Sequence, residues 1–154
     1  QNQGDFASGN TPSTTTPHDA ARLLLQSTFG PTMTDIEKVR SMGIGAWITD
    51  QIETQPATHH RDYIEKIMAD FDGPRTKLKH YSYNALSDVV NGNNVQTSFA
   101  RAAISGPDQL RQRTAFALSQ ILVISRRDAG LKNRPLAVSK FYDRFIRPSL
   151  RQLL

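Results

Sequence analysis

The chain has 154 residues, of which 38% are hydrophobic and 21% charged, and its net charge is +5 at pH 7. That length is sufficient for one domain with its own hydrophobic core. The absence of cysteine excludes disulfide bonds, thiolate metal sites and cysteine nucleophiles. No stretch approaches the roughly 18 consecutive apolar residues of a membrane-spanning helix, so we expect no transmembrane segment.

Residues 1–16 are dominated by Gly, Ser, Thr, Asn and Gln, and only Phe6 could bury much apolar surface. Such a segment cannot offset the entropy lost on ordering, so we predict a flexible polar tail. It lacks the basic and apolar regions of a signal peptide. Because a cysteine-free chain with a polar tail is common among exported bacterial proteins, we expect a periplasmic or secreted protein whose signal peptide has been removed.

Three helices are predicted in the first third of the chain. The first runs from Pro17 to Thr28, the second starts at a capping box from Thr34 to Glu37, and the third runs from Ile44 to about Glu53. Phe29 follows the first helix, and we expect it in the core. Trp47, the single tryptophan, is expected to be a core anchor between helices.

The middle of the chain predicts three further helices. They cover residues 57–71, 81–90 and 95–104, and the sequence Asn91–Asn94 between the last two is the clearest turn signal in the chain.

The organising element is the segment from Gly106 to about residue 126, which is apolar nearly all round. A helix of that kind belongs in the middle of a bundle. The residues of this segment that we place in the core are Leu110, Phe116, Leu118 and Ile121.

A final helix is predicted from Leu136 onward, and Pro148 interrupts it. No strand pattern of comparable quality occurs. The sequence therefore predicts an all-α, irregular bundle of about seven helices around the central helix, with residues 17–154 forming one domain. Because the chain stops on the apolar pair Leu153–Leu154 without a cap, we expect this domain to be the N-terminal part of a larger one.

Candidate catalytic and metal-binding residues are few. The histidines are His18, His59, His60 and His80. His59 and His60 are adjacent and would point about 100° apart on a helix, so they are expected to be surface residues rather than metal ligands. The chain contains no nucleophile elbow and no phosphate-binding loop. We therefore predict no metal and no cofactor, and we assign no catalytic residue.

Two arginines, Arg111 and Arg113, flank the apolar stripe of the central helix. An arginine in that position must be paired or solvated, because an unpaired buried charge is costly. One interpretation is a salt bridge or a clamp on backbone carbonyls that ties helices together. The other is that these arginines, together with Arg22, contact a carboxylate, sulfate or phosphate group of a ligand.

Charge is distributed unevenly along the chain. Residues 101–154 contain 11 basic and 3 acidic residues, whereas residues 1–100 contain 8 basic and 11 acidic ones. A basic half is compatible with an anionic polymer as partner. However, no run of five basic residues occurs and no aromatic residues alternate with the basic ones, so nucleic-acid binding is disfavoured.

Three segments carry a family resemblance. They are Asp19–Thr32 (DAARLLLQSTFGPT), Gly43–Gln51 (GIGAWITDQ) and Asp108–Ser125 (DQLRQRTAFALSQILVIS). In this order they resemble motifs of a bacterial family named domain of unknown function 1800, and Phe141–Asp143 and Leu150–Leu154 are similar to later motifs of that family. The resemblance implies further chain beyond Leu154 and export in many members. It implies no reaction.

These observations lead to two functional hypotheses. The first is a helical module of an exported bacterial protein, with a role in binding or envelope assembly. Its expected partners are the remainder of its own longer chain and an envelope protein or anionic polymer. The alternative is the N-terminal part of an enzyme that acts on an anionic or carbohydrate substrate, with catalytic residues beyond Leu154.

Overall fold

A computed structural model of the chain describes residues 15–70, 90, 92–124, 130–131 and 134–146. Within these residues the chain forms seven α-helices and one π-helical turn, and it contains no strand, which confirms the all-α prediction. In chain order the elements are α1 (Pro17–Ser27), α2 (Met33–Met42), α3 (Ile44–Thr49), the π-helix η1 (Asp50–Thr54), α4 (His60–Ala69), α7 (Gly92–Ser105), α8 (Gln109–Ile121) and α9 (Pro135–Ile146).

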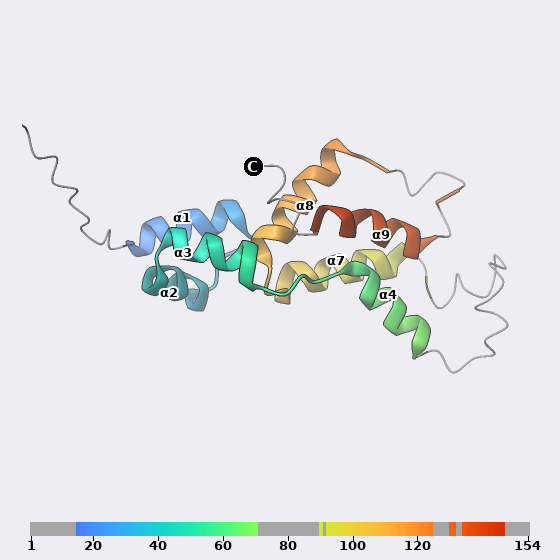
Figure 1. Cartoon of the computed structure of the whole chain (residues 1–154), viewed down its shortest axis with the longest axis horizontal. Helices are drawn as coiled ribbons and strands as arrows, with labels where there is room; N and C mark the ends of the chain where they lie inside the picture. Colours follow the sequence, from blue (N-terminus) through green and yellow to red (C-terminus); the bar gives the residue numbers. More distant parts are fainter. Residues whose placement is uncertain (1–14, 71–89, 91, 125–129, 132–133, 147–154) are drawn as a thin grey trace, which may run out of the picture.

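The helices form two groups that meet at α8. Helices α1, α2 and α3 lie at one end of an elongated molecule, and α4, α7 and α9 lie at the other (Figure 1). The predicted central helix corresponds to α8, which contacts α1 and η1 on one side and α7 and α9 on the other. The described helices are too short and too polar to cross a membrane.

The N-terminal helices begin with local caps. The hydroxyl of Thr16 accepts a hydrogen bond from the backbone N–H of Asp19 at 3.1 Å. Thr32 and Asp35 form a capping box at the start of α2. The sequence predicted this box two residues later, because Thr34 and Glu37 have the same spacing as the pair that forms it.

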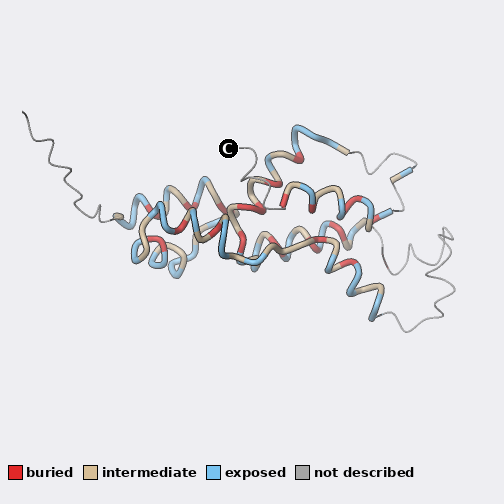
Figure 2. Tube along the Cα trace, in the orientation of Figure 1, coloured by how far each residue is buried: buried red, intermediate tan, exposed pale blue. Residues whose placement is uncertain are grey.

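Each helix group has an apolar core of its own. The first contains Ala20, Leu24, Val39 and Trp47, which are all at most 3% exposed, and Leu110 of α8 packs against it. The second contains Ile64, Val90, Val95 and Val138. Figure 2 shows that the buried residues lie where the helices face one another.

Helix α8 turns a polar face toward the interior. Its buried residues are Arg111, Gln112, Ala115 and Ser119, and Asp108 immediately before the helix is fully buried. Ile121, which the sequence placed in the core, is instead 77% exposed. The apolar stripe of α8 therefore did not predict its buried face, because Arg111 and Gln112 point inward and bond to other segments of the chain.

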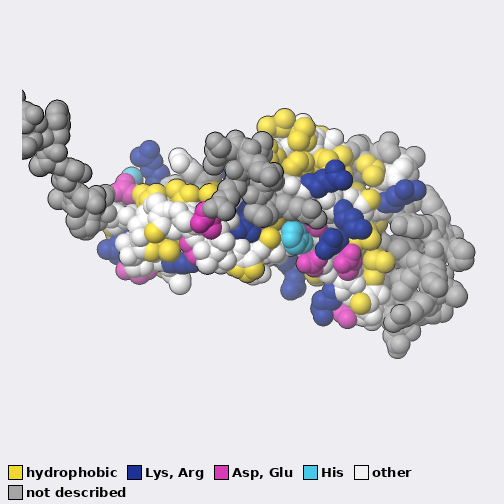
Figure 3. Space-filling model, viewed as in Figure 1, with side chains coloured by type: hydrophobic (Ala, Val, Ile, Leu, Met, Phe, Trp, Pro, Cys, Tyr) yellow, Lys and Arg dark blue, Asp and Glu magenta, His cyan; other side chains and the backbone are white. Residues whose placement is uncertain are grey.

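The last turn of α8 extends past its neighbours. Leu122 and Val123 follow Ile121 at the surface, with exposed fractions of 54% and 70%. Hydrophobic side chains gather at the upper middle of the view in Figure 3, where α8 ends in Figure 1. The helix is also shorter than the predicted 106–126, since it spans Gln109–Ile121.

Other boundaries differ from the predictions. Residues 44–54 form α3 followed by η1 rather than one α-helix, and α4 begins at His60 rather than at residue 57. Residues 92–94 lie in the first turn of α7, so the turn predicted there is wrong. The polar tail up to residue 14, the helix predicted over 81–90 except Val90, and the segment around Pro148 lie outside the described residues.

Candidate functional site

Arg111 closes the C-terminal end of η1. Its side chain is 5% exposed, and its Nη2 donates to the backbone carbonyls of Gln51, Ile52 and Gln55 at 3.1, 3.0 and 2.9 Å. Its Nη1 lies 3.9 Å from Oδ2 of Asp108. Carbonyls at a helix end have no partner within the helix, so this guanidinium supplies the donors that they lack. The structure therefore shows a carbonyl clamp between α8 and η1.

Asp108 and Gln112 hold the extended segment that leads into α4. Oδ2 of Asp108 accepts from the backbone N–H of Thr58 at 3.0 Å and from Nε2 of Gln112 at 3.2 Å. The same Nε2 donates to the carbonyl of Thr58 at 2.9 Å. The backbone of Thr58 thus has both of its polar groups bonded to side chains of the α8 region, which fixes where α4 begins.

Gln51 completes this arrangement from the other side. Its Nε2 donates to the carbonyl of Pro107 at 3.1 Å, and its Oε1 accepts from the backbone N–H of Leu110 at 3.2 Å. It therefore caps the first turn of α8, where the N-cap residue Asp108 makes no cap bond of its own. We refer to Gln51, Asp108, Arg111 and Gln112 as the junction network.

Asp143 of α9 performs the corresponding task for α4. Its Oδ1 accepts from the backbone N–H of His60 at 2.7 Å, and its Oδ2 accepts from that of Arg61 at 3.0 Å. The N-cap residue of α4, His59, provides no side-chain cap. A carboxylate at a helix N-terminus is favoured by hydrogen bonding and by the helix dipole. Asp143 therefore ties α9 to the start of α4.

The ring of His60 is buried next to this cap. It stacks on Phe99, with ring centroids 5.8 Å apart, and meets Tyr142 edge-on at 6.3 Å. Burial lowers the pKa of His60 from its ordinary value of 6.5, and the charge of Asp143 acts in the opposite direction. The imidazole is therefore neutral at neutral pH.

Ser98 lies beside this ring, with its Oγ 3.4 Å from Nδ1 of His60. The hydroxyl of Ser98 also donates to the carbonyl of Val95 at 2.8 Å. In the tautomer that carries its hydrogen on Nδ1, His60 donates to Ser98, and Nε2 keeps a lone pair as a hydrogen-bond acceptor.

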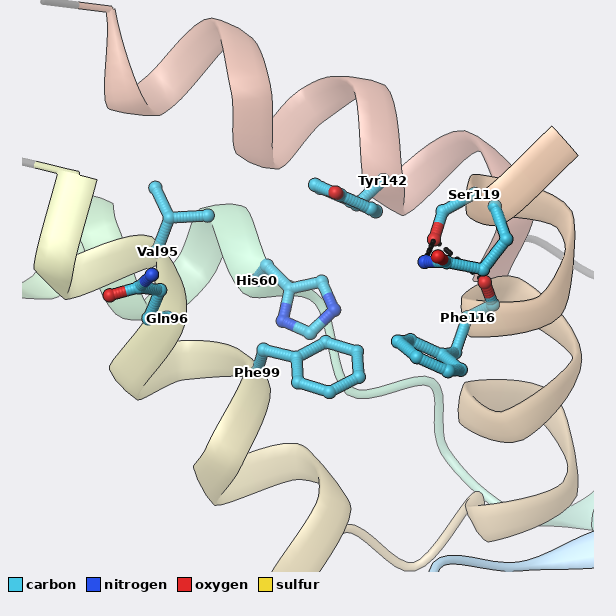
Figure 4. A pocket seen from close by; sticks show the side chains of 8 residues that line it. His60, Val95, Gln96, Phe99, Phe116, Ser119 and Tyr142 are labelled. Carbon is cyan, nitrogen blue, oxygen red and sulfur yellow. Dashed lines mark hydrogen bonds between the residues drawn. The ribbon is translucent and has the colours of Figure 1, made fainter. Parts of the chain in front are cut away.

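A pocket of about 260 Å³ opens beside His60, at the meeting point of α4, α7, α8 and α9. Figure 4 shows the imidazole between Phe99 and Phe116 on one side and Tyr142 on the other. We call this cavity the aromatic pocket. It is lined by His60, Val95, Gln96, Phe99, Phe116, Ser119, Gln120 and Tyr142.

The polar groups of this lining come from all four helices, and two of them, Ser119 and Gln120, lie on α8. Ser119 donates to the carbonyl of Phe116 at 2.7 Å, and Nε2 of Gln120 lies 3.4 Å from the Ser119 hydroxyl. The exposed Gln96 of α7 lines the pocket as well. The lining contains three aromatic rings, one neutral imidazole, two amides and the two hydroxyls of Ser119 and Tyr142, and it contains no carboxylate, lysine or arginine.

The three arginines singled out in the sequence lie in different surroundings. Arg113 is half-buried, with its guanidinium 5.5 Å from the ring centroid of Phe29 and 5.8 Å from that of Phe116. Arg111 is bound in the junction network, and Arg22 is exposed on α1. Arg111 and Arg113 therefore contact different residues, the first the end of η1 and the second the rings of Phe29 and Phe116.

The residues that the sequence placed in the core differ in burial. Trp47 is buried, whereas Phe29, Leu110, Phe116 and Leu118 are half-buried. Phe29 meets Phe99 and Phe116 edge-to-face at 5.6 and 6.0 Å, so it belongs to the aromatic cluster that backs the pocket.

Sequence reasoning missed several residues of the site. His60 was predicted to be a surface histidine, but it is only 3% exposed, because Phe99 and Tyr142 cover its ring. Asp143 carried a usable signal, since it is an acidic residue among the apolar positions of α9. Asp108 and Gln112 carried one too, because two polar residues four apart lie on the same face of a helix as Arg111.

Metal binding has no support in the described part of the chain, where no three histidine, aspartate or glutamate side chains are grouped to hold an ion. The comparisons with known proteins gave one match. The model of a family described as "Protein of unknown function (DUF1800)" matches residues 22–151. No curated protein matches the chain. No solved structure matches it either.

Proposed function

The chain belongs to the DUF1800 family, and we propose that it acts as a helical binding module whose aromatic pocket receives an uncharged ligand group. The description of that family names no activity. The observation that carries the proposal is the combination of aromatic rings and a neutral, hydrogen-bond-accepting histidine in one cavity. Ligand sites are typically apolar concavities with a few polar groups that orient the ligand.

The chemistry of the lining indicates the kind of group that fits. The rings of Phe99, Phe116 and Tyr142 offer apolar surface to a flat or ring-shaped group, and His60 offers a lone pair to a hydroxyl or N–H donor. A charged group would lose its hydration without gaining an opposite charge in the lining. A sugar ring or a phenol-like ring meets these requirements.

The pocket is supported by fixed elements. Asp143 caps α4 directly at His60, and the junction network fixes the segment before it. A binding site is more selective when its side chains are held in place before the ligand arrives. This support favours a binding role over a purely space-filling one for His60.

We also place the module in an exported protein, with a binding or envelope-assembly role, as the polar N-terminal tail and the family resemblance suggest. The alternative, an enzyme that binds an anionic substrate through arginines, would have to do so without Arg111. Its guanidinium is buried and already donates to three carbonyls.

The proposal is tested by an amide NMR titration with small probes. Phenol and methyl β-glucopyranoside carry a ring and hydroxyl donors, anisole has the same ring as phenol without the donor, and benzoate adds a charge. We expect phenol and the glucoside to shift amides of α4, α7, α8 and α9 around the pocket, and we expect anisole and benzoate to bind more weakly.

Gln120→Ala, on the exposed rim of the pocket, should weaken the binding of these probes, whereas Gln26→Ala on the exposed face of α1 should not. The proposal is wrong if none of the probes shifts the lining amides at millimolar concentration. It is equally wrong if the shifts fall mainly on α1, α2 and α3.

A further inference from the structure

A second hollow includes Asp143 in its lining and differs in chemistry from the aromatic pocket. Its volume is about 310 Å³, and it is lined by His59 and Arg61 from the start of α4 and by Lys140, Asp143 and Arg144 from α9. Four of these five side chains belong to basic residue types. We call it the basic hollow, and Figure 3 shows Lys and Arg side chains gathered with acidic ones over this part of the molecule.

The one acidic group in the lining is already engaged. Both oxygens of Asp143 accept backbone N–H groups of α4, and its side chain is only 10% exposed. Its charge is therefore directed at the positive end of the α4 dipole. Within the hollow, Nδ1 of His59 lies 4.0 Å from Oδ1 of Asp143.

The basic groups, by contrast, keep unused donors. Nε of Arg61 is buried without a hydrogen-bond partner and lies 3.6 Å from Oε1 of Glu65, and Nη2 makes one long hydrogen bond to Oδ1 of Asp62 at 3.4 Å. Lys140 and Arg144 are exposed, and neither forms an ion pair or hydrogen bond with a residue that the structure describes. They are four residues apart on α9 and so lie on the same face.

We propose that the basic hollow binds the phosphate group of a phosphate monoester. Arg61 and Arg144 present planar forks of donors that match tetrahedral oxyanions, and Lys140 adds a compact point charge. Three cations from two helices suit a dianion with three free oxygens better than a single carboxylate. The hollow is also larger than one phosphate group, which leaves room for the part of the ligand that carries it.

The proposal concerns a site separate from the aromatic pocket, since no lining residue is common to the two cavities. Both cavities border the start of α4, one through His60 and the other through His59 and Arg61. If the binding test of one site gives a negative result, the proposal for the other site is therefore unaffected.

The test is calorimetric titration of the chain at low ionic strength with glycerol 3-phosphate, inorganic phosphate and acetate as probes. The test variant is Lys140→Gln with Arg144→Gln. Its matched control is Arg40→Gln with Arg101→Gln, which changes the net charge equally at exposed positions of α2 and α7. We expect Kd for glycerol 3-phosphate to rise by about tenfold or more in the test variant and by less than about twofold in the control.

Because all four substituted residues are exposed, both variants should keep the unaltered Tm, which the same samples can verify. Inorganic phosphate whose binding is weakened by the same test variant supports a phosphate site, and it identifies phosphate as the part of the ligand that is recognised. The proposal is overturned if glycerol 3-phosphate does not bind the unaltered chain. It is also overturned if acetate binds as tightly, or if the control weakens binding as much as the test variant.

Discussion

The two helix groups of this protein are stabilised in different ways. Helices α1 and α2 begin with caps from residues three positions away and enclose an apolar core. Helices α4 and α8 and the end of η1 are instead capped by side chains 83, 59 and 56 residues away in the chain. The first group is specified largely by its own local sequence, whereas α4, α8 and η1 are complete only when distant segments have met.

This difference has an energetic counterpart. Removing an apolar side chain from the first group costs its transfer free energy and leaves a cavity. Removing a polar side chain from the junction network leaves buried backbone groups without partners, which is costly because they have no access to water. Substitutions in the two groups therefore test the comparison directly.

The largest effect is expected for Arg111→Met. The substitution leaves the carbonyls of Gln51, Ile52 and Gln55 without their donor and leaves the buried Asp108 without a nearby cation. We expect the free energy of unfolding to fall by about 4 kcal/mol in urea denaturation at pH 7. Arg22→Met at the exposed position on α1 is the control, with a change under about 0.5 kcal/mol. A loss below about 1 kcal/mol for Arg111→Met would show that the clamp contributes little.

The corresponding test in the first group is Leu24→Ala. Leu24 is 1% exposed in the first core, and we expect a loss of about 3 kcal/mol in the same measurement. The adjacent Leu25 is 63% exposed, so Leu25→Ala should change the free energy of unfolding by under about 0.5 kcal/mol. Equal losses in the two variants would contradict the assigned core.

Asp143→Ala removes the long-range cap of α4. Two backbone N–H groups lose a charged acceptor, and we expect a loss of about 2 kcal/mol. Asp143→Asn keeps one acceptor oxygen and should recover about half of that loss. If Asn were as destabilising as Ala, the negative charge rather than the hydrogen bonds would be the source of the stabilisation.

Thr32→Ala removes a local cap and provides the matching value for the first group. The Thr32 hydroxyl accepts from the backbone N–H of Asp35, and the Asp35 carboxylate accepts from the backbone N–H of Thr32. Only the first of these bonds is lost in this variant, because Asp35 remains in place. We expect a loss of about 1 kcal/mol, smaller than for Asp143→Ala. The reverse order of these two losses would argue against the proposed difference between local and long-range caps.

The smallest effect concerns pH. Because burial lowers the pKa of His60 below 6.5, the unfolded chain takes up a proton more readily than the folded one. The contribution of His60 to stability is therefore constant above about pH 6.5 and declines as the pH falls from there toward the lower folded pKa.

Urea denaturation between about pH 7.5 and 5.5 should show this decline in the unaltered chain, and His60→Gln should reduce it. His18→Gln, at an exposed position of α1, should leave it unchanged. An identical pH dependence in the unaltered chain and in His60→Gln would mean that other groups cause the decline.

Much of the fold could be predicted because its determinants are local. The cap at Thr16, the proline at the start of α1 and the helical spacing of apolar residues identified most helices and the all-α class. The family was also recognisable, since its motifs lie in α1, α3 and α8.

The site could not be predicted in the same way. Periodicity assumes that apolar residues point inward, yet α8 buries Arg111 and Gln112 and exposes Ile121. Those polar residues are stable inside only because η1 and the segment before α4 supply their partners. Such pairings join residues more than 50 positions apart, and no local pattern indicates them.

The cap that Asp143 provides to α4 also bears on how the chain folds as it is made. A helix of 10 residues such as α4 is marginal on its own in water. Its acceptor lies 83 residues further along the chain, which corresponds to roughly 4 to 17 seconds of synthesis at typical translation rates. The N-terminal helices, with local caps, can form during that interval, while α4 and the cavities beside it must wait for α9 to emerge.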